Sequence, residues 1–185
     1  MAESRESLEV IGATRRWLER AVIGLQLCPF AASPYAGGRV RMTVSEQTSS
    51  PALLEELRSE LVWLHAQDAN QWETTLLIHP FALTEFHAYN DFLSDCDAVL
   101  AELGLEGRLQ IASFHPDYQF AGTRAQDIEN CTNRSPYPML HLLREDSIER
   151  ALARVPDPDE IYRRNIRTLL KLGHEGWRRL WHDGD

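Results

Sequence analysis

A chain of 185 residues with 43% hydrophobic and 25% charged residues has the composition of a single soluble globular domain. The net charge of −9 disfavours a nucleic-acid-binding protein, because a phosphate backbone is repelled by an acidic surface. The apolar runs are too short to cross a bilayer and the N-terminus lacks the apolar core of a signal peptide. We therefore expect a cytoplasmic protein with no membrane partner.

Hydrophobic periodicity in the first half of the chain predicts helices alternating with strands. A helix is expected over residues 7–27, ending where Pro29 restricts the backbone of Cys28. Residues 39–45 alternate strictly between apolar and polar, which is typical of a half-exposed strand at a sheet edge. The Ser-Pro pair that follows predicts the start of a helix over residues 50–67.

The second half continues the alternation. The contiguous apolar run in residues 74–79 predicts a strand buried on both faces, and Thr84 is expected to cap the helix that follows, up to about residue 103. The remaining expected elements are a strand over 109–115, a strand or a helix over 139–143, a short helix opened by Ser147, and a helix over 158–181 capped by Asp157.

This order of elements predicts one α/β domain covering residues 1–185. We expect a mixed or mainly parallel sheet of three to five strands, with helices on both faces, built from residues 39–153. Between the third strand and the next element, residues 116–136 show no periodicity. A loop of that length in a compact domain is usually functional or disordered.

Two of the expected strands end in His-Pro, at His79 and at His115. Proline cannot donate to a sheet ladder, so each pair marks the point where a strand leaves the sheet. If the strands are parallel, both imidazoles emerge at the carboxyl edge, where open α/β sheets place their ligands. On neighbouring strands, about 4.8 Å apart, they can share a metal ion, a water or a substrate group. With one strand between them the gap is about 10 Å and convergence becomes marginal. Alternatively, each histidine caps its strand by bonding a nearby carbonyl.

Residues after the second His-Pro extend this candidate site. Asp117 can orient the imidazole of His115 or ligate a cation, or it is simply a turn residue. Tyr118 is a candidate pocket wall. The loop that follows offers a clamp for a polar or anionic substrate, because Arg presents a planar fork and Asn both donates and accepts. The clamp residues predicted in this loop are Asn130, Asn133, Arg134 and Tyr137.

Cys28 and His141 are left open as members of the site. Cys28 follows the C-terminal end of its helix, where the helix dipole disfavours a thiolate. His141 stands alone in an apolar run, which is more typical of a core histidine than of a ligand. The three cysteines have no CxxC spacing, so neither a disulfide framework nor a zinc knuckle is expected.

Four segments together resemble a bacterial domain family of unknown function, the family numbered 1415. They are CPFA from Cys28, the His-Pro at His79, HPDYQF from His115 and NCTNRSPYP from Asn130. The resemblance extends over nearly the whole chain and implies a stand-alone bacterial protein. It implies no reaction, cofactor or catalytic residue.

Our leading functional hypothesis is a small-molecule enzyme, hydrolase-like, in which His115 and His79 act as general base or as ligands of one divalent metal ion, with Asp117 assisting. A non-catalytic module that binds a small anion is the first alternative. An interaction subunit or homo-oligomer that uses Trp177 and Trp181 of the last helix is the second.

Overall fold

The structure is a computed structural model that describes residues 4–153, 155 and 157–181. Its centre is a four-stranded mixed sheet in the order β1-β2-β4-β3. The strands are β1 (Val40–Val44), β2 (Thr74–Ile78), β3 (Leu109–Phe114) and β4 (Met139–Arg144). Strands β1 and β2 are parallel, and β4 runs antiparallel to both β2 and β3. The α/β class with a mixed sheet is therefore confirmed, and the strand alternative for residues 139–143 is the correct one.

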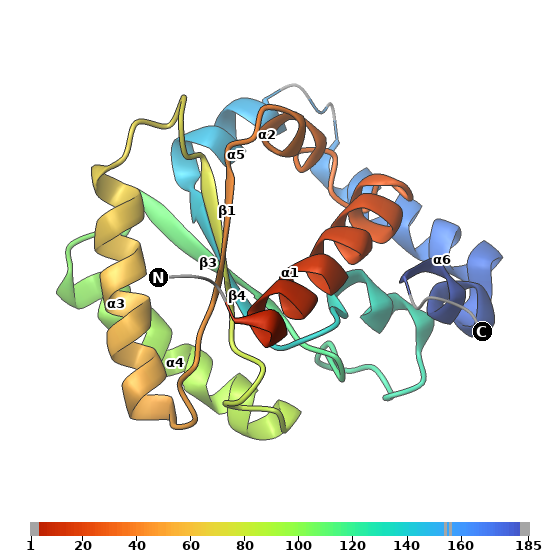
Figure 1. Ribbon diagram of the computed structural model, residues 1–185. Coiled ribbons are helices and arrows are strands. Elements are labelled where there is room, and N and C mark those ends of the chain that lie inside the picture. The colour runs from red at the N-terminus through yellow and green to blue at the C-terminus, as the bar shows by residue number, and fades with distance from the viewer. Residues whose placement is uncertain (1–3, 154, 156, 182–185) are drawn as a thin grey trace.

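Helices cover both faces of the sheet, which Figure 1 shows nearly edge-on. The face that we call the α4 side is covered by α3 (Ser50–Ala66) and α4 (Phe86–Glu102). The opposite face, the α1 side, is covered by α1 (Arg5–Trp17) and η1 (Leu18–Ile23), with α6 (Pro158–Trp181) outside them. The shorter helices are α2 (Ala32–Ala36), η2 (Ile128–Asn133) and α5 (Glu145–Leu152). Among the described residues, no helix has the length and apolar character needed to cross a membrane.

Several helices differ from the sequence-based expectation: α5 begins at Glu145 rather than at Ser147, and α6 is interrupted at Gly173, whose φ is 69°. The first helix does not run regularly to residue 27, because it widens into the π-helical η1, where the Gly24 N–H bonds the carbonyl of Glu19 at 2.9 Å. Thr84 does not cap α4. The carboxylate of Glu85 does so instead, accepting from the N–H groups of His87 at 3.1 Å and Ala88 at 3.0 Å. A carboxylate satisfies two orphan donors and matches the positive helix terminus, so it competes well with a hydroxyl here.

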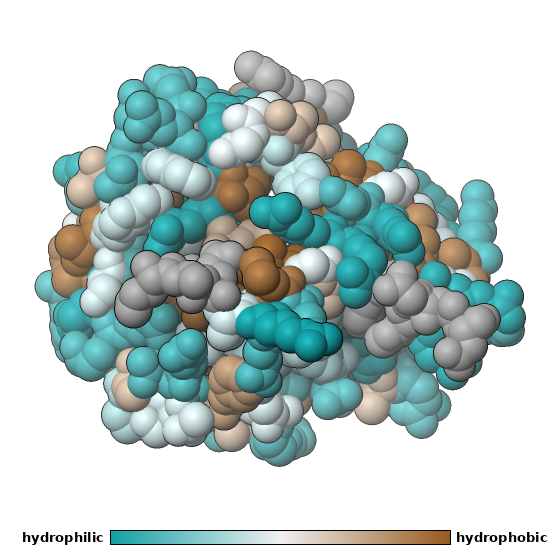
Figure 2. Space-filling view, in the orientation of Figure 1, coloured by the Kyte–Doolittle hydropathy of each residue, from teal (hydrophilic) through white to brown (hydrophobic). Residues whose placement is uncertain are grey.

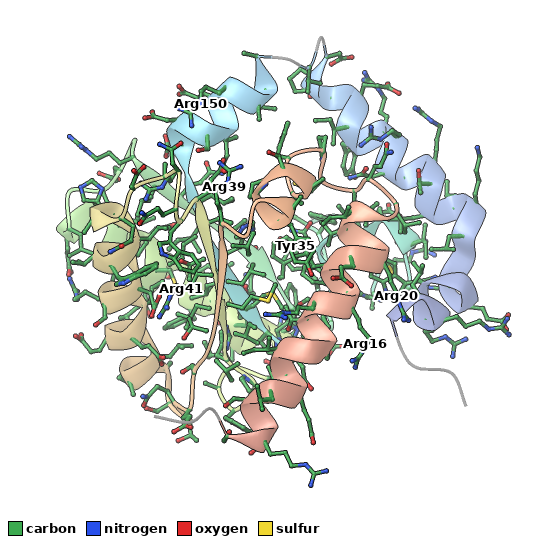
Figure 3. All side chains as sticks on the ribbon, turned by 45° about the horizontal axis from the view of Figure 1, so that its top comes forward. Arg16, Arg20, Tyr35, Arg39, Arg41 and Arg150 are labelled. Atoms are coloured by element: carbon green, nitrogen blue, oxygen red, sulfur yellow. The ribbon has the colours of Figure 1, made fainter. Side chains whose placement is uncertain are left out.

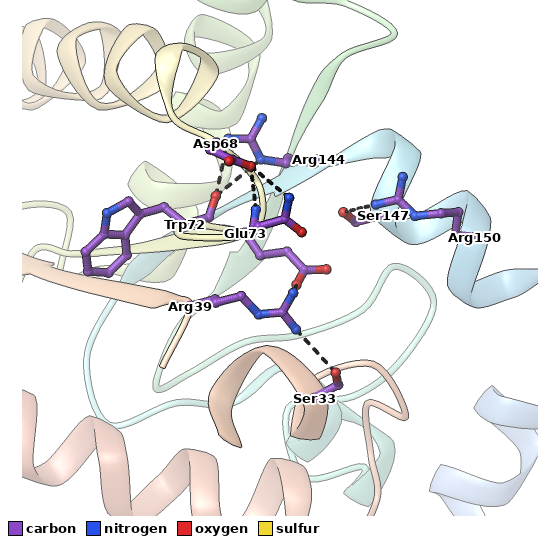
Figure 4. A network of polar contacts seen from close by, with 9 residues as sticks. Ser33, Arg39, Asp68, Trp72, Glu73, Arg144, Ser147 and Arg150 are labelled. Atoms are coloured by element: carbon purple, nitrogen blue, oxygen red, sulfur yellow. Dashed lines mark hydrogen bonds and ion pairs between the residues drawn. The ribbon is translucent and has the colours of Figure 1, made fainter. Parts of the chain in front are cut away.

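Arg144, at the end of β4, ties the sheet to the loop after α3 (Figure 4). Its guanidinium donates to the carbonyls of Leu64 at 2.7 Å and Gln67 at 2.8 Å, and to the carbonyl of Trp72 at 3.2 and 3.3 Å. The carbonyls at a helix C-terminus lack intrahelical partners, so one side chain here satisfies several of them at once.

Two further arginines lie at the edge strand β1, Arg39 just before it and Arg41 within it, and both are labelled in Figure 3. Arg39 forms an ion pair with Glu73 at 3.0 Å. Arg41 binds the carboxylate of Glu60 on α3 through two bonds of 3.0 Å and lies 4.3 Å over the ring of Trp63. Arg41 therefore faces α3, whereas Arg39 is held by the residue that precedes β2.

Candidate functional site

The sheet topology brings the two His-Pro strand ends to the same edge. Strands β2 and β3 are both antiparallel to β4, so they run in the same direction, with β4 between them. His79 and His115 therefore emerge together at the carboxyl edge but one strand apart, which is the wider of the two predicted spacings. Each backbone N–H is bonded by the loop before β4: His79 to the carbonyl of Pro138 at 3.0 Å, and His115 to that of Asn133 at 3.2 Å.

The imidazole of His79 is completely buried on the α4 side of the sheet, with 0% of the residue exposed. Its Nδ1 lies 2.9 Å from the carbonyl oxygen of Ala82. A carbonyl can only accept, so Nδ1 carries the proton and Nε2 holds a free lone pair. This Nε2 is buried and has no hydrogen-bond partner among the residues that the structure describes. Burial lowers the pKa of His79 from its ordinary 6.5 to about 4, so the ring is neutral at pH 7.

The imidazole of His115 is also fully buried but has both nitrogens occupied. The Asp117 N–H donates to Nδ1 at 3.0 Å, so the proton of the neutral ring is on Nε2, which donates to the carbonyl of Leu83 at 3.2 Å. Burial lowers the pKa of His115, and the nearby carboxylates of Asp117 and Glu85 act in the opposite direction. His115 is therefore a neutral ring held in one tautomer by the backbone.

Both histidines hold the same short loop, residues 80–84, by two adjacent carbonyls, those of Ala82 and Leu83. Leu83 has a φ of 55°, the left-handed conformation that side chains disfavour. Phe81, in the same loop, is 41% exposed. The loop is thus a short cover over the strand ends, kept in a strained conformation by two imidazole hydrogen bonds.

Tyr89 of α4 contacts both imidazoles and was not singled out by the sequence. Its ring centroid lies 5.7 Å from that of His79, in a stacked arrangement, and 5.1 Å from that of His115. Its hydroxyl donates to the carbonyl of Met139 at 2.9 Å and accepts from the N–H of Phe114 at 3.0 Å. Burial raises the pKa of Tyr89 far above its ordinary value, so the hydroxyl stays protonated. The only sequence signal for Tyr89 is its helical spacing from Phe92 and Cys96.

The rim of this edge is acidic. The side chains of Asp117 and Glu85 are exposed, and both interact electrostatically with His115. Tyr118 is half-buried against Phe86, with ring centroids 5.3 Å apart, and its hydroxyl accepts from Ser113 at 3.3 Å. Tyr118 therefore contacts Phe86, which in turn packs against His115, and its role as a pocket wall stays a prediction.

The side chains of the predicted clamp residues bind other parts of the protein itself, namely the loop backbone, strand β3 and the core. Asn130 is fully buried and bonds the backbone of Phe120 and Arg124 at 2.9 and 2.7 Å. Asn133 donates to the carbonyl of Ser113 at 3.1 Å. Arg134 donates to the carbonyls of Tyr118 at 3.2 Å and Ala125 at 2.6 Å, and Tyr137 packs on the core of the α1 side. In this conformation the clamp groups order the loop, and substrate binding by them stays a prediction.

Metal ligation by His79 and His115 also stays a prediction, and the donor set offers it little support. Among the described residues, no three His, Cys, Asp or Glu side chains come together as a metal site. Only Nε2 of His79 is an unoccupied donor, because the two nitrogens of His115 are already bonded to backbone groups.

The two residues left open have different surroundings. Cys28 is half-buried, and burial raises the pKa of its thiol, so it is a packed, protonated thiol. His141 lies on β4 on the α1 side of the sheet, away from the other two imidazoles, and its ring nitrogen Nε2 is 2.7 Å from the hydroxyl of Thr74. Trp177, expected at a partner surface, is 5% exposed and belongs to the core, and the side chain of Trp181 lies outside the described residues.

Residues 9–179 match the model of one protein family, which is described as "Protein of unknown function (DUF1415)". No curated protein and no solved structure matches the chain. The match includes all the residues of the strand-end site.

Proposed function

The chain belongs to the DUF1415 family, and we propose that it is a small-molecule enzyme, hydrolase-like, whose general base is the Nε2 atom of His79. In this proposal the structure is the resting state, closed by the 80–84 loop. Opening of the loop admits a substrate and a water to the carboxyl edge of the sheet.

The observation that carries the proposal is the unpartnered Nε2 of His79 in a fully buried ring. A buried polar atom without a partner is costly and uncommon, so it calls for a role. The Nδ1–H bond to the carbonyl of Ala82 is the bond that fixes a histidine as a base, because it leaves the lone pair on Nε2. When the loop opens, water reaches the ring, the desolvation that lowers its pKa is relieved, and the basicity rises toward that of a free imidazole.

In the reaction, Nε2 of His79 takes a proton from the attacking water and later returns it to the leaving group. His115 and Asp117 position the loop, through the bonds of the His115 ring to Leu83 and to the Asp117 backbone. The exposed carboxylates of Asp117 and Glu85 give the rim a negative field. Of the two predicted substrate types, polar and anionic, this field favours an uncharged polar substrate.

The test is turnover of chromogenic p-nitrophenyl esters, phosphates and glycosides by the wild type and three variants. In His79→Asn, the amide nitrogen can keep the bond to Ala82 while the base is lost. We expect kcat to fall by about 10²–10⁴-fold with little change in KM. His115→Asn should reduce turnover less, and His65→Asn, an exposed position on α3, should be neutral. Unchanged turnover in His79→Asn would refute the assignment of the base.

The second candidate is a non-catalytic module that binds a small molecule. It is favoured by one observation: three of the four ring nitrogens of His79 and His115 already bond the backbone, so the histidines can act purely as loop holders. A module of this kind would show no turnover with any chromogenic substrate. A ligand that raises the Tm of the wild type by the same amount in His79→Asn would then support binding without proton transfer.

A further inference from the structure

The α1 side of the sheet is not sealed along its whole length. On β4, Met139 is fully buried, but the next two residues on the same face, His141 and Leu143, are half-buried. The α4 side of the same strand has no such opening, because Leu140 and Leu142, which point to it, are both 0% exposed. An inner strand is therefore closed on one face and reached by solvent on the other.

His141 is deep in the molecule although solvent reaches it. Burial lowers its pKa from 6.5 to about 4, and no charged group among the described residues contributes to that shift. Because β4 is an inner strand and α1 and η1 cover this face of the sheet, solvent that reaches His141 enters through a recess in the covering layer. Figure 2 shows hydrophobic side chains in the middle of the face seen from the β1 edge, framed by hydrophilic ones.

The hydrogen bonds of His141 leave one ring nitrogen open. The Thr74 hydroxyl donates its single proton to the carbonyl of Leu142 at 2.6 Å, so its oxygen accepts from the Nε2–H of His141 at 2.7 Å. The neutral ring then has its lone pair on Nδ1. This atom has no protein partner in the described part of the chain, and it is not among the buried unsatisfied atoms there. Nδ1 is thus an acceptor that faces accessible space.

The side chains beside this acceptor are apolar. Ala112 is the cross-strand partner of His141 on β3, and Phe114 lies with its ring centroid 6.1 Å from that of His141. Leu143 follows on the same face of β4, and Met42 lies on that face of β1. All four are half-buried. An uncharged acceptor surrounded by accessible apolar surface is the usual composition of a small-molecule site.

We propose that this region is a second binding site, for a neutral and largely apolar small molecule that carries one hydroxyl or N–H group. The apolar body contacts Met42, Leu143 and Phe114, and the donor bonds Nδ1 of His141. An anion is disfavoured, because a lone pair faces the ligand and no charged group among the described residues contributes to the electrostatics of the His141 ring. The site is independent of the strand-end site, since His79 and His115 lie against α4 on the opposite face of the sheet.

The test is a titration at pH 7 with phenol, toluene and benzoate, followed by NMR of the Met42 methyl group and the His141 ring. We expect phenol to shift both signals saturably. Toluene should bind about tenfold more weakly because it lacks the donor, and benzoate should not bind. Two variants that fill the space, Leu143→Trp and Ala112→Leu, should each weaken phenol binding at least tenfold.

The matched control is Val62→Trp, which adds the same ring at an exposed position of α3 and should leave the phenol Kd unchanged. Equal affinity for phenol and toluene would overturn the role of Nδ1. Absence of saturable shifts with every probe, or an unchanged phenol Kd in both filling variants, would overturn the site itself, and Nδ1 would then hold only water.

Discussion

Lowering the pH should reduce the free energy of unfolding through protonation of His79, and the substitution His79→Asn should remove this contribution. In the unfolded chain the imidazole has its ordinary pKa of 6.5, whereas in the fold burial lowers the pKa to about 4. The unfolded state therefore binds a proton in the window from pH 6.5 to 4 that the folded state does not bind. Stability from this group is complete above pH 6.5 and is lost as the pH falls through that window.

The magnitude follows from the two pKa values. Between pH 7 and pH 5 the loss is about 2 kcal/mol, and it approaches about 3.4 kcal/mol below pH 4, at about 1.36 kcal/mol per pKa unit. Other groups titrate in the same range, so the informative quantity is the difference between the wild type and His79→Asn.

The assay is urea unfolding at fixed ionic strength at pH 7 and pH 5, followed by tryptophan fluorescence. The wild type should lose about 2 kcal/mol more than His79→Asn over this interval. His65→Asn, on the exposed face of α3, should keep the full wild-type loss. Equal losses in the wild type and His79→Asn would show that the His79 ring does not stay neutral in the fold, and the reasoning about its lone pair would fail with it.

Three further outcomes can be checked with the same preparations. Tyr89→Phe should lower the free energy of unfolding by about 2–3 kcal/mol, because it leaves two buried backbone groups without a partner, whereas Tyr162→Phe, at an exposed position, should change it little. Arg144→Met should cost about 2–4 kcal/mol in urea unfolding by freeing the carbonyls at the end of α3; the control is Arg150→Met on exposed α5, and an equal effect of the two would contradict this account. Zinc added in excess and removed by gel filtration should not stay bound stoichiometrically; retention of one ion that is lost in His79→Asn would restore the metal hypothesis.

Much of the fold was predictable because local patterns encode it. The run of apolar residues in 74–78 is buried on every position, and the alternating segment became the edge strand β1. The insertion of β4 between β2 and β3 was not predictable. It depends on pairing between segments more than 60 residues apart, and residues 139–143 carry an apolar run that suits a helix equally well.

The site was predictable in place but not in detail. Proline after His79 and His115 marks where the strands end, which is a local property. Which carbonyls the rings bond depends on the path of the 80–84 loop, and Ala82 and Leu83 of that loop pack into the tertiary core of the α4 side. Likewise, the sequence shows that Arg134 can bind an anion, but not that backbone carbonyls occupy its guanidinium first.

The strand order also sets the sequence of events when the chain leaves the ribosome. The inner strand β4 is the last of the four to be synthesised, yet β3 joins the sheet only through it, and the β1-β2 pair has no other link to β3. Until residue 144 has emerged, β2 and β3 each have an unpaired edge, which is the kind of surface that other chains can pair with. The sheet is therefore completed late, so this nascent chain should depend on a holding chaperone more than a protein whose strands pair in the order of synthesis.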